Sequence, residues 1–138
     1  MKRTAYNLII AAAAVLAAVT TGSAQSLKAE IPFPFVANGA RMQPGSYSMT
    51  MGRLGGSATT VQIYNVDDRH SILTLPQMTD TSWKHPDSKP VLTFACTEGR
   101  CVLVSMRDDL SRVYSFRSGK TGPGTRIATV ALRSDRTE

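Results

Sequence analysis

The sequence predicts an all-β protein, a single small antiparallel β-sandwich or barrel of about eight short strands that follows an N-terminal signal peptide. Several short segments alternate apolar with polar residues, which is the period of a half-buried strand. Turn-forming pairs such as Asn38-Gly39 and Pro44-Gly45 separate these segments at hairpin spacing. Beyond the N-terminal leader, no segment has the pattern of a helix. These observations leave the choice between sandwich and barrel open.

Length and composition exclude several other classes of protein. The chain has 138 residues, of which 42% are apolar and 19% charged, with ten Gly and seven Pro. This composition excludes a collagen-like chain, a disordered acidic tail and a charged coiled coil. The length that follows residues 1–24 suits one domain and is too short for two, so residues 25–138 are expected to form a single β domain.

The first 24 residues have the three-part layout of a secretory signal peptide. Lys2 and Arg3 supply the positive start, Leu8–Val19 is an apolar run, and Gly22 and Ala24 are small residues before a cleavage site. The alternative is a membrane anchor, but the apolar run is well short of the ~20 residues that span a bilayer. We expect cleavage after Ala24, export to the periplasm or the extracellular space, and no membrane insertion afterwards.

The first strand is expected over Leu27–Phe35. Its odd-numbered residues are all apolar and should face the core, while its even-numbered residues should face outward. Pro32 and Pro34 lie in the outward set. Because proline has no backbone N–H to donate, the strand is predicted to lie at the edge of a sheet.

The remaining strands follow from the same alternation. In the segment Ser46–Met51 the apolar positions are Tyr47, Met49 and Met51, and in the next they are Val61 and Ile63. The segment Pro76–Pro90 has no periodicity and is predicted to be a long surface loop, with Trp83 as its only large apolar residue. The strands expected after the first are Ser46–Met51, Thr59–Val66, Ser71–Leu75, Val91–Cys96, Cys101–Met106, Val113–Arg117 and Arg126–Arg133.

The two cysteines, Cys96 and Cys101, are predicted to form a disulfide. They are the only cysteines in the chain, and export would place them where such bonds persist. The four residues between them suit a hairpin loop, and directly opposed strand residues come close enough for the bond. The closed loop is short, so the bond should fix the register of the hairpin rather than hold the whole fold.

The Val91–Met106 hairpin is predicted to be covered on both faces. With Cys96 opposite Cys101, Phe94 should oppose Leu103 and Leu92 should oppose Ser105, and both faces are then mainly apolar. The second face, which includes Val102 and Val104, must therefore meet the loop around Trp83, a second sheet or another protein chain. Trp83, Val102 and Val104 form the predicted interaction surface.

The start of the predicted domain resembles a known group of proteins. The stretch Ile31-Pro32-Phe33-Pro34-Phe35, the turn Asn38-Gly39 and the pattern Met42-x-Pro44-Gly45-x-Tyr47 are similar to the opening of small exported β-rich proteins of Acidobacteria-type soil bacteria. Those proteins have an I-P-F-x-F strand, a short turn and an L-P-A-G-x-Y segment that leads into the second strand. The cysteine pair of this chain departs from their pattern. The resemblance implies the fold and the export, and it implies no chemistry.

The sequence offers no convincing catalytic, metal or cofactor site. It lacks a G-x-S-x-G nucleophile motif and a glycine loop for phosphate. Asp67, Asp68 and His70 lie close together, but they match no known ligand spacing, and Asp67-Asp68 is better explained as a turn former whose side chains bond the backbone two residues on. The pair Asp108-Asp109 is expected in a solvated loop.

Two functions remain. The first is an exported, non-catalytic β-module that binds an unknown protein, a surface polymer or another copy of itself. The second is a small-ligand carrier, whose apolar barrel pocket would be lined by Phe33, Phe35, Tyr47, Phe94 and Phe116. The module instead predicts that these aromatic residues close-pack. Nucleic-acid binding is not expected, because the formal net charge of +6 is small and includes Lys2 and Arg3 of the leader.

Overall fold

The computed structural model describes residues 26–56, 58–80, 89–118 and 122–134. Within these ranges the chain forms twelve strands and no helix, which confirms the all-β class. The predicted signal peptide, residues 1–24, and Trp83 lie outside the described residues.

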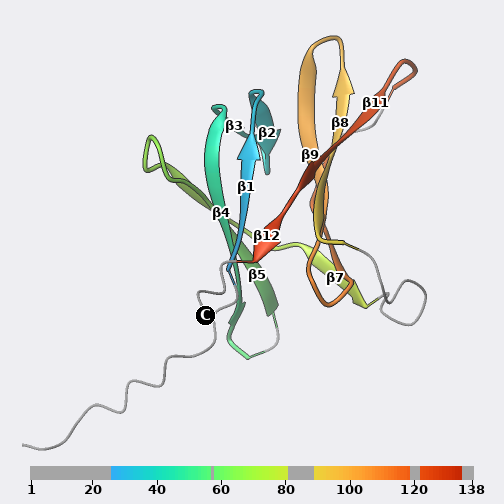
Figure 1. Ribbon diagram of the computed structural model, residues 1–138. Coiled ribbons are helices and arrows are strands. Elements are labelled where there is room, and N and C mark those ends of the chain that lie inside the picture. The colour runs from blue at the N-terminus through green and yellow to red at the C-terminus, as the bar shows by residue number, and fades with distance from the viewer. Residues whose placement is uncertain (1–25, 57, 81–88, 119–121, 135–138) are drawn as a thin grey trace, which may run out of the picture.

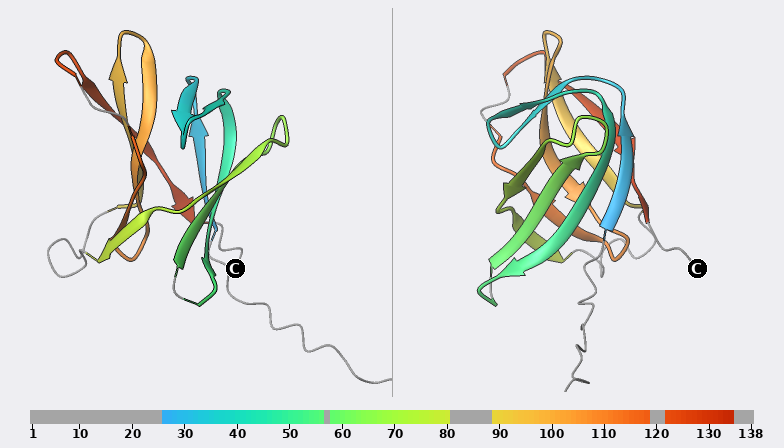
Figure 2. Two further views of the ribbon diagram at one scale, coloured as in Figure 1. Left: turned by 180° about the vertical axis from the view of Figure 1, so that it is seen from behind. Right: turned by 90° about the vertical axis from the view of Figure 1, so that its left-hand side faces the viewer.

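The strands form two sheets packed face to face, so the fold is a β-sandwich (Figure 1, Figure 2). Sheet A has the order β12 (Arg133–Ser134), β1 (Ser26–Ile31), β4 (Gly45–Leu54), β5 (Ala58–Asn65), β6 (Ser71–Thr74). The main path of sheet B is β11 (Arg126–Ala131), β8 (Val91–Thr97), β9 (Arg100–Arg107), β10 (Arg112–Ser115), β7 (Gln77–Asp80). The short hairpin of β2 (Phe35–Ala37) and β3 (Ala40–Met42) joins sheet B through a parallel pairing of β2 with β9.

Two segments of the chain run from one sheet into the other at the edges of the sandwich. β6 leads through Leu75 and Pro76 into β7, and β11 leads through Leu132 into β12 (Figure 1). Each bent segment therefore belongs to sheet A at one end and to sheet B at the other. The sandwich closes at these edges as a flattened barrel does, which explains why the strand pattern alone was compatible with both architectures.

The strand predicted over Leu27–Phe35 is in fact two elements in different sheets. β1 ends at Ile31, and the chain crosses through Pro32-Phe33-Pro34 to β2 in sheet B. The predicted facing is confirmed, since Leu27, Ala29, Ile31 and Phe35 are buried, although Phe33 is only half-buried. The predicted edge position is wrong, because β12 pairs with the start of β1 on its outer side. The prolines end β1 at the crossing, where no N–H is needed for a ladder.

The sequence predicted that the whole segment Pro76–Pro90 is a loop. This prediction is wrong for part of the segment, because it contains β7. This strand pairs antiparallel with β10, which lies more than thirty residues further along the chain, from Gln77↔Ser115 to Asp80↔Arg112. The sequence of β7 has no period-two pattern that could reveal it, and its strand conformation depends on the ladder with β10.

The core lies between the two sheets and is built by alternate residues of each strand. Tyr47, Met49 and Met51 of β4 and Val61 and Ile63 of β5 are buried, as predicted. The aromatic rings pack edge to face in the core, with ring centroids 5.2 Å apart for Phe35–Tyr47, a contact between the two sheets, and 5.3 Å apart for Phe35–Phe94, a contact within sheet B. The Phe35–Tyr47 contact joins sheet A to sheet B in the middle of the molecule.

Candidate interaction surface

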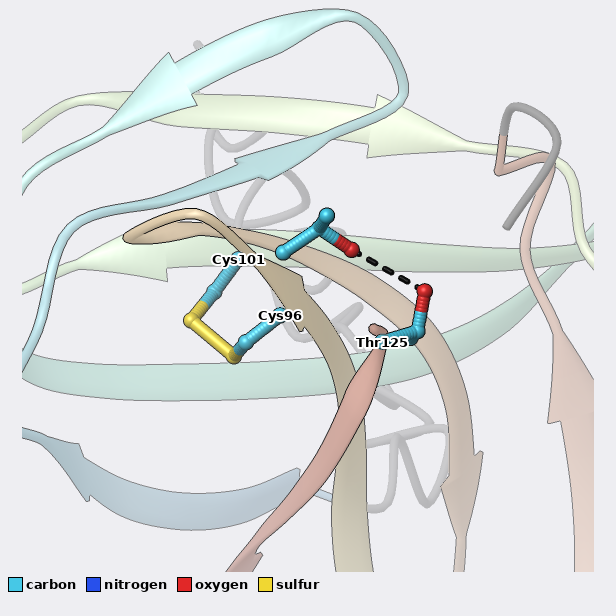
Figure 3. The surroundings of a disulfide bond; sticks show 4 residues. Cys96, Cys101 and Thr125 are labelled. Atoms are coloured by element: carbon cyan, nitrogen blue, oxygen red, sulfur yellow. Dashed lines mark hydrogen bonds between the residues drawn. A yellow bond between two sulfur atoms is a disulfide. The ribbon is translucent and has the colours of Figure 1, made fainter. Parts of the chain in front are cut away.

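The β8–β9 hairpin carries the predicted disulfide (Figure 3). Cys96 and Cys101 are directly opposite each other with Cα atoms 4.0 Å apart, and their sulfur atoms are bonded. The connection is tighter than the four-residue loop that the sequence predicted, because Thr97 pairs with Arg100 and only two residues form the turn. Glu98 and Gly99 have φ angles of 52° and 79°, the left-handed geometry of a two-residue hairpin turn.

The turn end of the β8–β9 hairpin is also bonded to the chain just before β11, the strand that pairs with β8 on the side away from β9. Thr97 and Thr125 share a hydrogen bond of 3.0 Å between their hydroxyls, and Thr125 immediately precedes β11 (Figure 3). The disulfide and this hydrogen bond together fix the hairpin end relative to β11.

The predicted register of the hairpin is confirmed near the disulfide and wrong beyond it. Phe94 opposes Leu103, as expected, but Leu92 opposes Met106 instead of Ser105. A β-bulge after Thr93 inserts Val104 as an extra residue in β9. Without the bulge, Met106 would lie on the second face of the hairpin, with Val102 and Val104. With the bulge, its side chain points to the core and is fully buried.

The side of sheet B that faces away from the core carries a continuous apolar row among polar side chains; we call it the outer face of sheet B. Cross-strand pairing places this row in the order Arg41, Val36, Val102, Ala95, Ile127. Val36, Val102 and Val104 are half-buried, and Ile127 is 65% exposed. The outer face consists of Val36, Arg41, Gln77, Thr79, Val91, Thr93, Ala95, Thr97, Arg100, Val102, Val104, Ser105, Arg107, Val113, Ser115, Ile127, Thr129 and Ala131.

The corresponding outer face of sheet A has the opposite character. Its side chains are mainly polar, although Leu54 and Leu73 are each 57% exposed, and several bond to one another: Ser26 Oγ lies 2.9 Å from Ser48 Oγ, and Ser46 Oγ donates to Glu30 Oε1 at 2.6 Å. This face is suited to contact with water. Its residues are Ser26, Lys28, Glu30, Ser46, Ser48, Thr50, Gly52, Leu54, Ala58, Thr60, Gln62, Tyr64, Ser71 and Leu73.

The charges on the outer face of sheet B are all positive. Within the part of the chain that the structure describes, this face carries Arg41, Arg100 and Arg107 and no Asp or Glu, although Glu98 lies in the adjoining turn. The Nε of Arg107 is buried and has no acceptor among the described residues. An apolar row with a basic rim is an arrangement that can bind a partner of complementary charge.

A groove of about 360 Å³ lies at one end of this face. One wall comes from the β2–β3 hairpin with Arg41, and the other comes from the β8–β9 turn with Arg100. The parallel pairing of Val36 with Val102 places β2 of the first hairpin beside the start of β9 in the second. The groove is lined by Pro34, Phe35, Val36, Gly39, Arg41, Gly99, Arg100 and Cys101.

The aromatic residues that a carrier would use are packed against each other instead. Phe33 and Phe35 both contact the ring of Phe94 edge to face, and Phe35 also contacts Tyr47. Two further surface depressions have volumes of about 350 and 450 Å³. Of the five aromatic residues predicted to line a carrier's pocket, Phe116 lines the first depression and none lines the second. Each depression opens at the surface rather than inside the barrel.

Asp108 is fully buried, so the predicted solvated position of this residue is wrong. Its carboxylate accepts hydrogen bonds from the backbone N–H groups of Leu110 and Arg112, both at 2.9 Å, from Arg112 Nε at 2.7 Å and from the Tyr114 hydroxyl at 3.0 Å. Burial and the neighbouring Asp108 charge raise the pKa of Tyr114 to about 12. These hydrogen bonds close the turn between β9 and β10. These donors to Asp108 all belong to this turn or to β10.

A second buried polar group explains the Pro44-Gly45-x-Tyr47 pattern. The Tyr47 hydroxyl donates to the backbone carbonyl of Gln43 and accepts from Asn65 Nδ2 at 2.9 Å. Asp67 accepts from the backbone N–H of Ser46 at 2.9 Å. These bonds join the start of β4 to the turn after β5, much as a tyrosine corner does in other β-sandwiches.

The described residues form no group of three or more His, Cys, Asp or Glu that could hold a metal ion. The predicted role of the acidic turn is confirmed at Asp68, whose Oδ1 accepts the backbone N–H of His70 at 2.9 Å, two residues on. His85 and Asp87, the nearest such residues in the segment that follows β7 in sequence, lie outside the described residues.

No protein-family model, curated protein or solved structure matches this chain. In the described part of the chain, no helix has the length and apolar character needed to cross a membrane.

Proposed function

We propose that this protein is an exported, non-catalytic binding module that contacts its partner through the outer face of sheet B. The observation that carries the proposal is the contrast between the two outer faces. The face of sheet A is mainly polar and bonded within itself, with Leu54 and Leu73 as separate exposed apolar side chains, whereas that of sheet B has a continuous apolar row that ends at Ile127, which is 65% exposed. An apolar sheet face of this kind is typical of a surface that another molecule covers.

The packing of the core favours a module over a carrier of small apolar ligands. The rings of Phe35, Tyr47 and Phe94 fill the centre of the sandwich, where a carrier would need a void. A carrier also needs a pocket that encloses most of its ligand.

Export is supported by two independent features. The Cys96–Cys101 bond is compatible with an oxidising compartment, and the N-terminal sequence has the layout of a signal peptide. The resemblance of the opening motif to small exported β-rich proteins points the same way. Periplasmic and extracellular locations are both compatible with these features.

The proposal is tested on protein released gently from the native host and separated by size-exclusion chromatography. The wild-type protein should elute as part of a larger assembly, and Ile127→Lys should elute as the isolated chain. The matched control is Leu73→Lys, which alters a 57% exposed apolar residue on the outer face of sheet A and should elute like the wild type. Equal elution of all three proteins, or a small apolar molecule bound stoichiometrically in native mass spectrometry, would contradict the proposal.

A further inference from the structure

We propose that the outer face of sheet B binds an extended peptide segment of a partner protein, one that carries both apolar and acidic side chains, with its carboxylates in the groove between Arg41 and Arg100. This inference rests on the proposed function and specifies the class of partner.

The charges of the face determine the acidic character of the partner. Arg41, Arg100 and Arg107 are the charged residues of this face in the described chain, and Glu98 lies in the adjoining turn, so the face as a whole attracts an acidic segment. Arg41 and Arg100 are both exposed and line the same groove from opposite walls. Guanidinium groups recognise carboxylates through paired, charge-assisted hydrogen bonds.

The apolar row determines that the partner also has apolar side chains. Val36 lines the groove and pairs with Val102, and the row continues through Ala95 to the exposed Ile127. A polysaccharide with carboxylates would satisfy the arginines but would leave this row uncovered. A peptide in extended conformation can present carboxylates and apolar side chains along the same line, because its side chains project at regular intervals.

The groove is held in shape before binding, which lowers the entropy cost of association. One wall is fixed by the disulfide at Cys96 and Cys101, and the other continues from the crossing at Pro34. The turn residues of both walls, Gly39 and Gly99, have φ angles of 78° and 79° in tight hairpin turns. Ordering of the loops is therefore not required when the ligand arrives.

The test is a fluorescence-anisotropy titration of the full exported protein with a labelled twelve-residue peptide of the repeat Val-Ser-Glu-Ser (the Val-Glu peptide), in which Val and Glu project from the same face of the extended chain. Three competitors are used: the same peptide with Lys in place of Glu, an oligoglutamate, and an oligogalacturonate. The test variant is R41A/R100A, and the matched control R53A/R133A removes two exposed arginines that lie in sheet A.

The Val-Glu peptide should bind saturably and more tightly than each competitor. R41A/R100A should weaken this binding by roughly tenfold or more, because both charge-assisted contacts are lost, while R53A/R133A should change it less than threefold. Equal weakening in both variants, tighter binding of the oligogalacturonate, or no saturable binding would overturn the inference. A concentration-dependent dimer in sedimentation velocity that Ile127→Lys abolishes would assign the face to a second copy and would also overturn it. If the peptide titration fails and native mass spectrometry shows no bound small molecule, the proposed binding module still stands and only the peptide inference is lost. The two proposals can therefore fail separately.

Discussion

The Asp108 carboxylate accepts four hydrogen bonds and has no exposure to solvent. Asp108→Asn should reduce the free energy of unfolding by about 3–5 kcal/mol, because an amide cannot accept all of these donors and Arg112 loses its ionic partner. Urea denaturation measures the change. Glu98→Gln, at an exposed position in a neighbouring turn, should change stability by less than about 0.5 kcal/mol. Similar losses in the two variants would contradict the structural role of Asp108.

The hydroxyl of Tyr114 provides a pH-dependent test of the same group. Its pKa is raised to about 12 by burial and by the Asp108 charge, against an ordinary value of 10.0 in the unfolded chain. The folded state therefore holds this proton more tightly, so the contribution is complete below pH 10 and is lost as the pH rises toward about 12. Over this window the free energy of unfolding should fall by on the order of 2 kcal/mol more in the wild type than in Tyr114→Phe. Urea denaturation curves at several alkaline pH values measure the difference, and parallel pH profiles would contradict it.

Gly45 is required by its neighbour Asp67 as well as by its own backbone. It has a φ of 153°, and a Cβ at this position would lie 2.5 Å from Asp67 Oδ2, the atom that accepts the Ser46 N–H. Gly45→Ala should therefore destabilise the protein by about 1–3 kcal/mol. If the contact with Asp67 is the cause, the penalty should be smaller in an Asp67→Ala background, and a double-mutant cycle measured by thermal denaturation shows the coupling. Additive effects would assign the cost to the backbone alone.

At the scale of single elements, the disulfide acts on the β8–β9 hairpin. The closed loop is short, with a sequence separation of 5 between the cysteines, so the bond restricts few conformations of the unfolded chain. The double variant C96A/C101A should keep the fold and lose about 2 kcal/mol of stability. Urea denaturation with and without reductant should give that difference in the wild type and none in the variant. A variant that fails to fold would show that the bond holds the whole sandwich.

The elements predicted correctly are those whose pattern is local, whereas β2 and β7, which were not predicted as separate strands, depend on distant partners. β4 and β5 have clear alternation, and Tyr47 and Ile63 are buried as expected. β2 and β7 are short, and each pairs with a strand far along the chain, β9 and β10 respectively. No window of sequence contains that information, because the strand conformation of such segments comes from the ladder they join. The bulge at Val104 also has no local signal, because the pairing of Cys96 with Cys101 determines the register only as far as the ladder continues without an inserted residue.

At the scale of the whole molecule, the sequence predicted that a second face of the hairpin is apolar but not how far that face extends. Val102 was identified because it alternates with core residues in one strand. Val36, Arg41 and Ile127 belong to the same row, yet they come from strands whose order in sheet B only the fold reveals. The site is therefore a property of sheet topology, and the chain order of its residues gives no sign of their adjacency.

Phe33 and Phe35 lie where the chain passes from sheet A to sheet B, and they differ in burial and contacts. The sequence gives both residues the same inward facing, so each substitution to Ala would be expected to cost about 3–5 kcal/mol. In the structure Phe35 is 2% exposed and contacts both Tyr47 of sheet A and Phe94 of sheet B, whereas Phe33 lies in the crossing and is half-buried. Phe35→Ala should therefore cost about 3–5 kcal/mol and Phe33→Ala clearly less, because the ring of Phe33 leaves a site that water can partly reach. Urea denaturation of the two variants gives the order, and an equal or larger loss for Phe33→Ala would mean that the crossing, rather than the centre of the sandwich, holds the sheets together.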